Sequence, residues 1–375
     1  MPWREVSHMD QRMEFVRLFQ QPDVNRRELC RRFQISPKTG YKWLARAQTT
    51  EARWAQDQSR RPHVSPKRSD LEVEAAVLAI RDAHPAWGAR KIRRRLDDRQ
   101  ASLPAASTVH AMLARHDRVP APNQPSHYTR FEHPAPNDLW QMDFKGRFPL
   151  GEGMCHPLTM IDDHSRYALC LQACSNERQD TVQQHLIGCF RRYGLPQAFL
   201  VDNGVPWGTC SEVRWTRLRV WLLKLGVDVV YARPYHPQTK GKNERFHRTL
   251  KSEVLSMATY RTTQQMQQAF DRWRHVYNAE RPHQALGYDV PANRYRPSTR
   301  AMPGQLREPD YDEGTIVRRA SWHKAQFRFG KKRWRMPEAF SGELLAIRPL
   351  ATDGAFGVFF GAHQIASIDL RNEAT

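Results

Sequence analysis

The sequence lacks the features of membrane, secreted and zinc-binding proteins. No apolar run could span a bilayer, and the most apolar helix candidate, 220–230, is interrupted by Lys224, Gly226 and Asp228. The six cysteines form no CxxC pair, which favours reduced thiols over a disulfide framework or a zinc site. Because residues 1–5 show no apolar signal core, we expect a cytoplasmic protein.

Acidic residues are also in the minority. Lys and Arg number 59 against 39 Asp and Glu, which gives a formal charge of +20 over 375 residues. The length predicts two to four domains, and a chain this basic most often binds a polyanion, nucleic acid before a membrane surface. The excess charge is concentrated in the first third and near the C-terminus, so we expect DNA-binding modules on both sides of a more neutral core.

Residues 1–50 read as a helix-turn-helix domain. Ser36 and Pro37 form an N-cap and first helical position, and Tyr41 and Leu44 are expected to face the core of the third helix. A basic third helix of this kind enters the DNA major groove. The expected DNA-contacting residues are Lys38, Thr39, Lys42 and Arg46. A three-helix bundle with a basic surface is the alternative.

Residues 68–118 predict a second helical DNA-binding unit, followed by a Pro-rich linker at 119–136. Ser69 with Glu72 resembles a capping box, and Ser107 is expected to cap the last helix. The middle helix is strongly basic, and its expected DNA contacts are Arg90, Lys91 and Arg94.

Residues 137–296 predict an α/β catalytic core. Asp143 lies in an alternating strand, on the face opposite Trp140 and Met142. Asp202 ends a short apolar strand, where α/β sheets present functional groups, although a simple turn residue is the alternative. Glu244 begins a helix expected to reach about Met257.

Three carboxylates brought together would repel one another, so such a cluster implies a bound cation. Oxygen ligands select Mg²⁺ or Mn²⁺ over softer metals. Two such ions per site would activate the attacking oxygen and stabilise the leaving oxygen at a phosphodiester. Asp143, Asp202 and Glu244 are therefore the expected catalytic residues and metal ligands.

Five motifs in order resemble bacterial insertion-sequence transposases with a retroviral-integrase-like DDE core. They are Trp140-Gln-Met-Asp143, Asp162-Asp-His-Ser-Arg166, Val201-Asp-Asn-Gly204, the segment His236–Lys251, and Tyr277–Gly287. The resemblance implies a ribonuclease H-like fold with a mixed five-stranded sheet, and the same three carboxylates as metal ligands. The spacing between Asp202 and Glu244 is longer than is usual for the superfamily, with an apparent insertion at 207–216.

The resemblance also implies roles around these carboxylates. Lys251, two helical turns after Glu244, would contact DNA near the cleaved end. The other DNA contacts expected on this helix are Lys242, Asn243, His247 and Arg248. Asn203 and Gln238 are expected to support the ligands from a second layer.

Residues 314–372 predict a small all-β barrel, because short strand-like runs alternate with Gly and Pro. Lys331 and Arg333 are the expected DNA contacts, and Phe327, Phe329 and Trp334 alternate with them. An ordinary barrel core explains these aromatic residues equally well.

The sequence thus predicts a multidomain, nucleoid-associated bacterial DDE transposase. It would bind double-stranded DNA as at least a dimer, at the terminal inverted repeats and at the target. It would nick the element ends to release 3′-hydroxyls and join them to target DNA by two-metal phosphoryl transfer. The alternatives are an inactive DNA-binding regulator derived from a transposase, and a ribonuclease H-like nuclease that cuts without joining.

Overall fold

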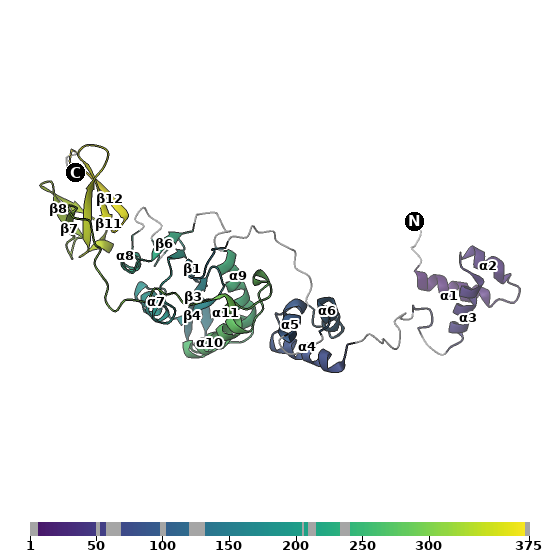
Figure 1. The fold of residues 1–375 in the computed structure, drawn as a ribbon. Helices are drawn as coiled ribbons and strands as arrows, with labels where there is room; N and C mark the ends of the chain where they lie inside the picture. The colour runs from purple at the N-terminus through teal and green to yellow at the C-terminus, as the bar shows by residue number, and fades with distance from the viewer. Residues whose placement is uncertain are drawn as a thin grey trace. The chain divides into compact units, whose positions relative to one another are not determined.

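The computed structural model describes residues 7–49, 53–57, 69–97, 103–119, 132–204, 206–208, 215–232 and 241–371. The chain divides into two compact units, 1–68 and 69–375 (Figure 1). Within the described ranges, no helix is both long and apolar enough to cross a bilayer.

The first unit is a three-helix domain of α1 (His8–Phe19), α2 (Arg26–Arg32) and α3 (Pro37–Ala47). Ser36 caps α3 as predicted, because its hydroxyl accepts the Thr39 N–H at 3.2 Å and Pro37 follows at the first helical position. The prediction for Tyr41 was wrong. Its side chain is 51% exposed, and Trp43 is buried in its place.

The phase of α3 follows from its close approach to α1. A Cβ added at Gly40 would lie 2.9 Å from the Phe15 ring, so only glycine allows the two helices this near. Gly40 and Trp43, three residues apart, therefore share the inward face. Tyr41 is left at the rim, edge-to-face against Phe19 at 5.3 Å.

The second unit begins with α4 (Leu71–Ala83), α5 (Ala89–Asp97) and α6 (Ala106–Arg115). Their shared core contains Val77, Trp87, Ile92, Leu96, Val109, Met112 and Leu113. Both predicted caps were wrong, because Asp70 precedes α4 and Ala105 precedes α6, each without a side-chain cap bond. Burial of its apolar side chains sets the rotation of a helix, but the residue at which the helix begins can still differ by one or two positions.

The central sheet has six strands in the order β2-β3-β1-β5-β6, with β4 paired to β3. The strands are β1 (Leu139–Phe144), β2 (Phe148–Leu150), β3 (Gly153–Asp162), β4 (Ala168–Cys174), β5 (Ala198–Val201) and β6 (Asp228–Tyr231). The pairs β1–β5 and β5–β6 are parallel, and the others are antiparallel. The five expected strands of a mixed sheet are therefore present, and the three-residue β2 adds a sixth.

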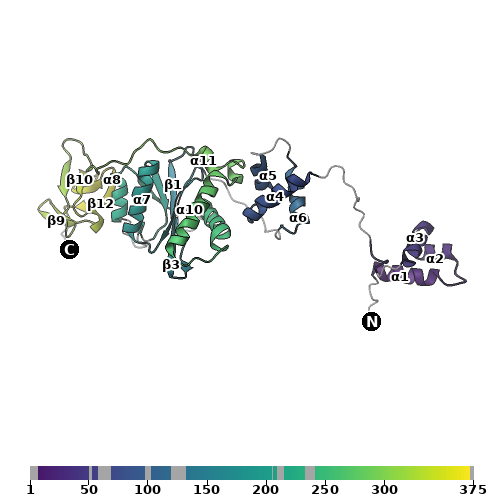
Figure 2. The same cartoon turned by 90° about the horizontal axis from the view of Figure 1, so that it is seen from below.

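Helices cover both faces of this sheet, with α7 (Gln179–Tyr193) on one side and α10 (Thr263–Ala279) on the other (Figure 2). On the α7 side of the sheet, Trp140 and Met142 pack into a hydrophobic core with residues of α7 and α8 (Arg217–Lys224). The opposite core joins Ile161 of β3 to α10 and to α9 (Gly241–Leu250). This alternation puts Asp143 on the α9 face, as the sequence predicted.

The helix that begins at Gly241 changes its winding after Leu250. A π-helical segment, η2 (Lys251–Leu255), follows, and the Ser256 N–H bonds to the Lys251 carbonyl at 2.9 Å. The extra residue in this turn rotates the side chains after Leu250 relative to the buried side that contains Phe246 and Leu250. Leu255 is consequently buried, whereas Met257, the predicted end of the helix, lies beyond η2 and is 56% exposed.

After η3 (Gln284–Leu286) and α11 (Pro291–Arg294), the chain runs along the core without regular structure. Arg300 anchors this stretch by donating to the Pro196 carbonyl at 2.6 Å and to the carbonyls of Leu225 and Gly226. These bonds hold the stretch against the core.

The C-terminal strands form two antiparallel sheets around one core. The four-stranded sheet has the order β12-β11-β10-β7, and β8-β9 is a separate hairpin. The strands are β7 (Ile316–Arg319), β8 (Gln326–Phe329), β9 (Lys332–Arg335), β10 (Leu344–Pro349), β11 (Ala355–Phe360) and β12 (His363–Asp369), with η4 (Glu338–Phe340) between β9 and β10. Val220 of α8 is buried in this core, and Lys224 pairs with Glu343 at 2.9 Å. The expected all-β domain is thus present and packs on α8.

Candidate active site

The register of β1 and β5 brings two of the predicted carboxylates together. The parallel pairing runs from Leu139 opposite Ala198 to Gln141 opposite Leu200. Asp143 and Asp202 each lie two residues after this last pair. Because side chains alternate along a strand, both aspartates point to the same face of the sheet as Gln141 and Leu200. They are therefore neighbours at the carboxyl ends of adjacent parallel strands, on the face where Leu139 and Leu200 pack together.

Glu244 lies in the first turn of α9, exposed to solvent. Its helix is tied to the sheet one turn later, where His247 Nε2 lies 2.8 Å from the Thr159 hydroxyl. Thr159 is directly opposite Asp143 in the β1–β3 ladder and donates its only proton to the Asp143 carbonyl at 2.9 Å. The histidine Nε2 must therefore be the donor to Thr159. This chain of contacts holds α9 beside Asp143.

The donor set has the chemistry of a magnesium or manganese site, because all three side chains offer carboxylate oxygens. Among the described residues, however, no three His, Cys, Asp or Glu side chains are grouped closely enough to hold a metal. The register of the sheet places the two aspartates side by side, and the His247–Thr159 contact fixes α9 beside Asp143. Gln238 lies outside the described residues.

Asn203 ties together the ends of two parallel strands. Its side-chain amide donates to the Ala232 carbonyl at 2.9 Å, and the Ala232 N–H bonds back to the Val201 carbonyl at 2.9 Å. The loop that follows Asp202 is thereby fixed to the end of β6. Such an arrangement suits the supporting role predicted for Asn203.

The five DNA contacts predicted on this helix differ in exposure. Arg248 and Lys251 are exposed, whereas Asn243 and His247 are buried at 1% and 9%. Lys242 is largely buried and pairs with Asp163. Burial, and then repulsion from Arg166, lower the pKa of Lys242 to about 8 against the opposing effect of Asp163. DNA contact by these residues stays a prediction.

The predicted contacts on α3 and in the C-terminal hairpin differ in exposure as well. On α3, Lys38 and Lys42 are exposed, Thr39 is half-buried, and Arg46 lies 4.9 Å over the Trp43 ring. In the C-terminal hairpin, Lys331 and Arg333 are exposed, and the Trp334 indole donates to the Phe329 carbonyl at 3.0 Å. Lys38, Lys42, Lys331 and Arg333 are open to a polyanion, and contact of any of these residues with DNA stays a prediction.

A cationic pocket of about 530 Å³ lies between the second helical unit and the core. Its lining residues are Gly88, Ala89, Arg90, Lys91, Ala106, Ser107, His110, Gln284 and Tyr288. None of these residues is acidic, and Arg90 hydrogen-bonds to the Tyr288 side chain. Sequence reasoning identified Arg90 and Lys91 but missed Gln284 and Tyr288, which only the docking of α5 and α6 on the core brings to the same place.

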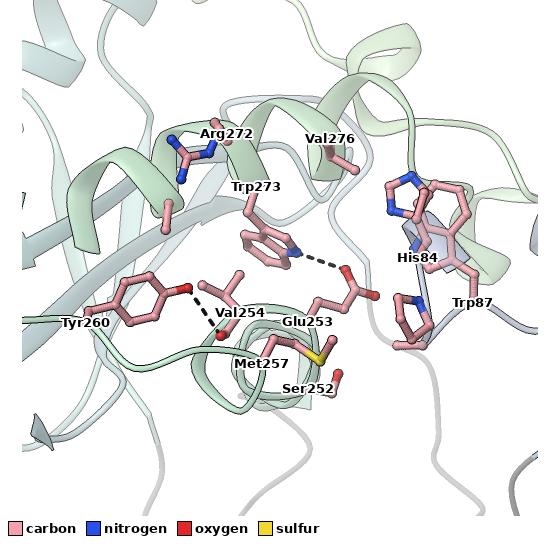
Figure 3. A pocket seen from close by; sticks show the side chains of 14 residues that line it. His84, Trp87, Ser252, Glu253, Val254, Met257, Tyr260, Arg272, Trp273 and Val276 are labelled. Carbon is pink, nitrogen blue, oxygen red and sulfur yellow. Dashed lines mark hydrogen bonds between the residues drawn. The ribbon is translucent and has the colours of Figure 1, made fainter. Parts of the chain in front are cut away.

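A second pocket, of about 280 Å³, lies at the same joint (Figure 3). On the side of the second helical unit, the rings of His84 and the buried Trp87 stack with 3.9 Å between their centroids. From the core side, Glu253 accepts from the Trp273 indole at 2.9 Å and from Arg281 at 3.0 Å. Together with the Arg95–Glu280 ion pair at 2.9 Å, these residues fasten the helical unit to the core.

Most of the chain matches known protein families. The integrase core domain family matches residues 133–237 and again 225–291. Homeodomain-like domains match 9–52 and 39–113, and the C-terminal domain of the IS481 family transposases matches 324–375. The chain therefore combines the domains of an insertion-sequence transposase with an integrase core. The matches follow the order of the parts: helix-turn-helix units, a ribonuclease H-like core, and antiparallel C-terminal sheets.

Relatives of this chain include uncharacterized proteins of two insertion elements. The 39.2 kDa protein of IS476 from Xanthomonas euvesicatoria is 27% identical over 42% of the chain and 44% of its own length. The 31.7 kDa protein of IS407 from Burkholderia multivorans is 26% identical over 42% of the chain and 55% of its own length. The chain therefore spans about half the length of the curated relatives it matches.

Solved viral structures show weaker similarity. The simian T-cell lymphotropic virus intasome, in complex with PP2A regulatory subunit B56 gamma, has a TM-score of 0.40 and 13% identity, covering 78% of this chain and 95% of that chain. The HTLV-2 integrase catalytic core domain in complex with magnesium has a TM-score of 0.32 and 11% identity, covering 43% and 97%. We draw nothing from similarities of this size.

Proposed function

We propose that the chain is an active DDE transposase that joins element ends to target DNA. Asp143, Asp202 and Glu244 would hold the metal ions, Mg²⁺ or Mn²⁺, two per site. The observation that supports this most directly is the β1–β5 register, which pairs Asp143 with Asp202 at the carboxyl end of the sheet.

Two like charges side by side gain nothing for the fold, so their pairing favours a role in binding a cation. Bound metal would stabilise the attacking and leaving oxygens at the phosphodiester. Glu244 would join the two aspartates from the first turn of α9, a helix that Phe246 and Leu250 anchor to the core at 1% and 0% exposure.

The reaction consists of two displacements at phosphorus. Water first attacks the phosphodiester at each element end and breaks the P–O3′ bond, which releases a 3′-hydroxyl. That hydroxyl then attacks a target phosphodiester, forming a new P–O3′ bond as the target's own 3′-oxygen leaves with a proton. No covalent link to the protein forms at any step.

DNA handling would be divided among the modules. The α1–α3 unit and the α4–α6 unit would bind the terminal inverted repeats, with Lys42 and Lys91 contacting phosphates. Arg248 and Lys251 extend along α9 beyond Glu244, where they would meet the cleaved end. Since two ends must be joined to one target, at least two copies of the chain would act together, in association with the bacterial nucleoid.

The test is a joining assay with purified full-length protein, Mg²⁺, a supercoiled plasmid, and labelled duplexes from the DNA flanking the gene. Glu244→Gln keeps the size and shape of the side chain but removes its charge and replaces one acceptor oxygen by an NH2 donor. We expect it to abolish joining and to leave duplex affinity unchanged. The matched control is Glu152→Gln, the same change at a glutamate 63% exposed on the β2–β3 turn, which should join like wild type.

Three results would contradict the proposal. Joining by Glu244→Gln at the wild-type rate would remove Glu244 from the site. Tight duplex binding without joining by wild type would favour the regulator derived from a transposase. Cutting without joining would favour the nuclease.

A further inference from the structure

The turn between β3 and β4 contains a buried carboxylate that touches both elements of the proposed active site. We propose that Asp163 is a positioning residue, which holds α9 in the place on β1 that presents Glu244 beside Asp143. This inference rests on the proposed function for what Glu244 does, but the contacts that support it are independent of any reaction.

Asp163 is completely buried and makes contacts in three directions. Its Oδ1 accepts from the Gln141 side-chain amide at 2.7 Å, and its Oδ2 accepts from the His133 N–H at 2.8 Å. The Lys242 ammonium pairs with Oδ2 at 2.5 Å and also lies 3.3 Å from the Asp163 carbonyl. A charge removed from water in this way is tolerated only with such partners.

The partners of Asp163 lie close in sequence to two of the proposed metal ligands. Gln141 precedes Asp143 by two residues on β1, and Lys242 precedes Glu244 by two residues on α9. One carboxylate therefore joins the strand of the first aspartate to the helix of the glutamate. The His247–Thr159 contact makes a second joint three residues beyond Glu244. Glu244 is thus bracketed by two links between α9 and the sheet.

Other groups around the turn do not replace Asp163. Arg166 directs its guanidinium to Glu132 at 2.8 Å. The Gln141 Oε1 is buried without a hydrogen-bond partner among the described residues, so the bond to Asp163 is what orients this amide. Without the Asp163 charge, Lys242 would lose this ion pair in a largely buried place, and the first turn of α9 would be expected to move toward solvent.

Asp162 provides a matched control in the same turn. It is also completely buried, and its Oδ1 accepts from the Ser165 N–H at 2.7 Å and from the Ser165 hydroxyl at 2.6 Å. Its Oδ2 accepts from the Asn137 N–H at 2.8 Å. None of these contacts reaches α9. Asp162→Asn and Asp163→Asn therefore make the same change at equal burial, and only the second removes a link to the helix.

The experiment compares full-length wild type, Asp162→Asn and Asp163→Asn by amide hydrogen exchange and by Mn²⁺ titration followed by electron paramagnetic resonance. For Asp163→Asn we expect exchange at 241–245 to accelerate and Mn²⁺ affinity to fall, each by about tenfold, the loss typical of a residue supporting a ligand. Affinity for duplex DNA should stay within about twofold. For Asp162→Asn both site measurements should stay at wild-type values, even if the melting temperature falls.

Lys242→Met removes the same link from the other end without changing the turn, which covers the case in which Asp163→Asn does not fold. It should accelerate exchange at 241–245 as well. Wild-type exchange at 241–245 in both Asp163→Asn and Lys242→Met would overturn the proposal, as would equal acceleration in Asp162→Asn. Because exchange requires no joining, failure of the wild-type joining assay would count against the proposed function alone.

Discussion

Lys91 offers a prediction in which stability and DNA affinity respond to pH in opposite directions. Burial lowers the pKa of this lysine from its ordinary value of 10.5 to about 8, and repulsion from Arg281 acts in the same sense against the weaker pull of Glu253. Among the described residues no carboxylate forms an ion pair with it. Lys91 therefore lines the cationic pocket as a charge that the fold itself does not neutralise.

The sign of each effect follows from proton binding. Between about pH 8 and pH 10.5 the unfolded chain holds a proton on Lys91 that the folded chain has lost, so the free energy of unfolding should rise with pH in this window. At 1.36 kcal/mol per pKa unit, the whole shift corresponds to about 3 kcal/mol as an upper estimate. A DNA phosphate in the pocket favours the charged amine, so binding above pH 8 must take up a proton. Affinity should then fall by up to about tenfold per pH unit.

The assay is duplex binding from about pH 7 to about pH 9.5 at constant ionic strength, with urea unfolding of the free protein over the same range. Lys91→Met should bind weakly at all pH values, and its stability should lose the rise above pH 8. Lys91→Arg, charged throughout, should keep its affinity as pH increases. Superimposable affinity profiles for wild type and Lys91→Met would refute the reasoning, because they would show that Lys91 does not meet DNA.

Two further changes test the packing that holds the site. Phe246→Ala removes a ring that is 1% exposed and packs on Trp273 at 5.4 Å, so it should cost about 3–5 kcal/mol in urea unfolding, whereas Met257→Ala should cost under about 0.5. Similar losses for the two would show that α9 is not anchored through Phe246. Gly194→Ala should destabilise by about 2 kcal/mol or more, since φ is +76° and the new Cβ would lie 2.6 Å from the Ser298 carbonyl. Gly188→Ala, in open space on α7, should be neutral or stabilising by thermal unfolding, and a neutral Gly194→Ala would contradict the geometry.

Local patterns in the sequence determined the elements and the family. The alternation around Asp143 predicted β1 and its inward face, and Ser36 with Pro37 predicted the start of α3, because both signals come from neighbours along the chain. The same patterns failed where a distant contact decided the outcome. Gly40 against Phe15 sets the rotation of α3 and exposes Tyr41. They also did not reveal the local π-helical turn after Leu250, where the regular helix ends before Met257.

The candidate site also has one part that local sequence predicts and another that depends on contacts between distant residues. Residue type and motif order were enough to select Asp143, Asp202 and Glu244 from the sequence. The partners that hold their elements lie far apart along the chain: Gln141, Asp163 and Lys242 meet through one carboxylate, and Thr159 meets His247. Sequence spacing cannot specify such meetings, because they depend on strand register and on how α9 packs against the sheet. The sequence therefore determined which side chains are available for chemistry, and only the tertiary structure decided which others hold them in place.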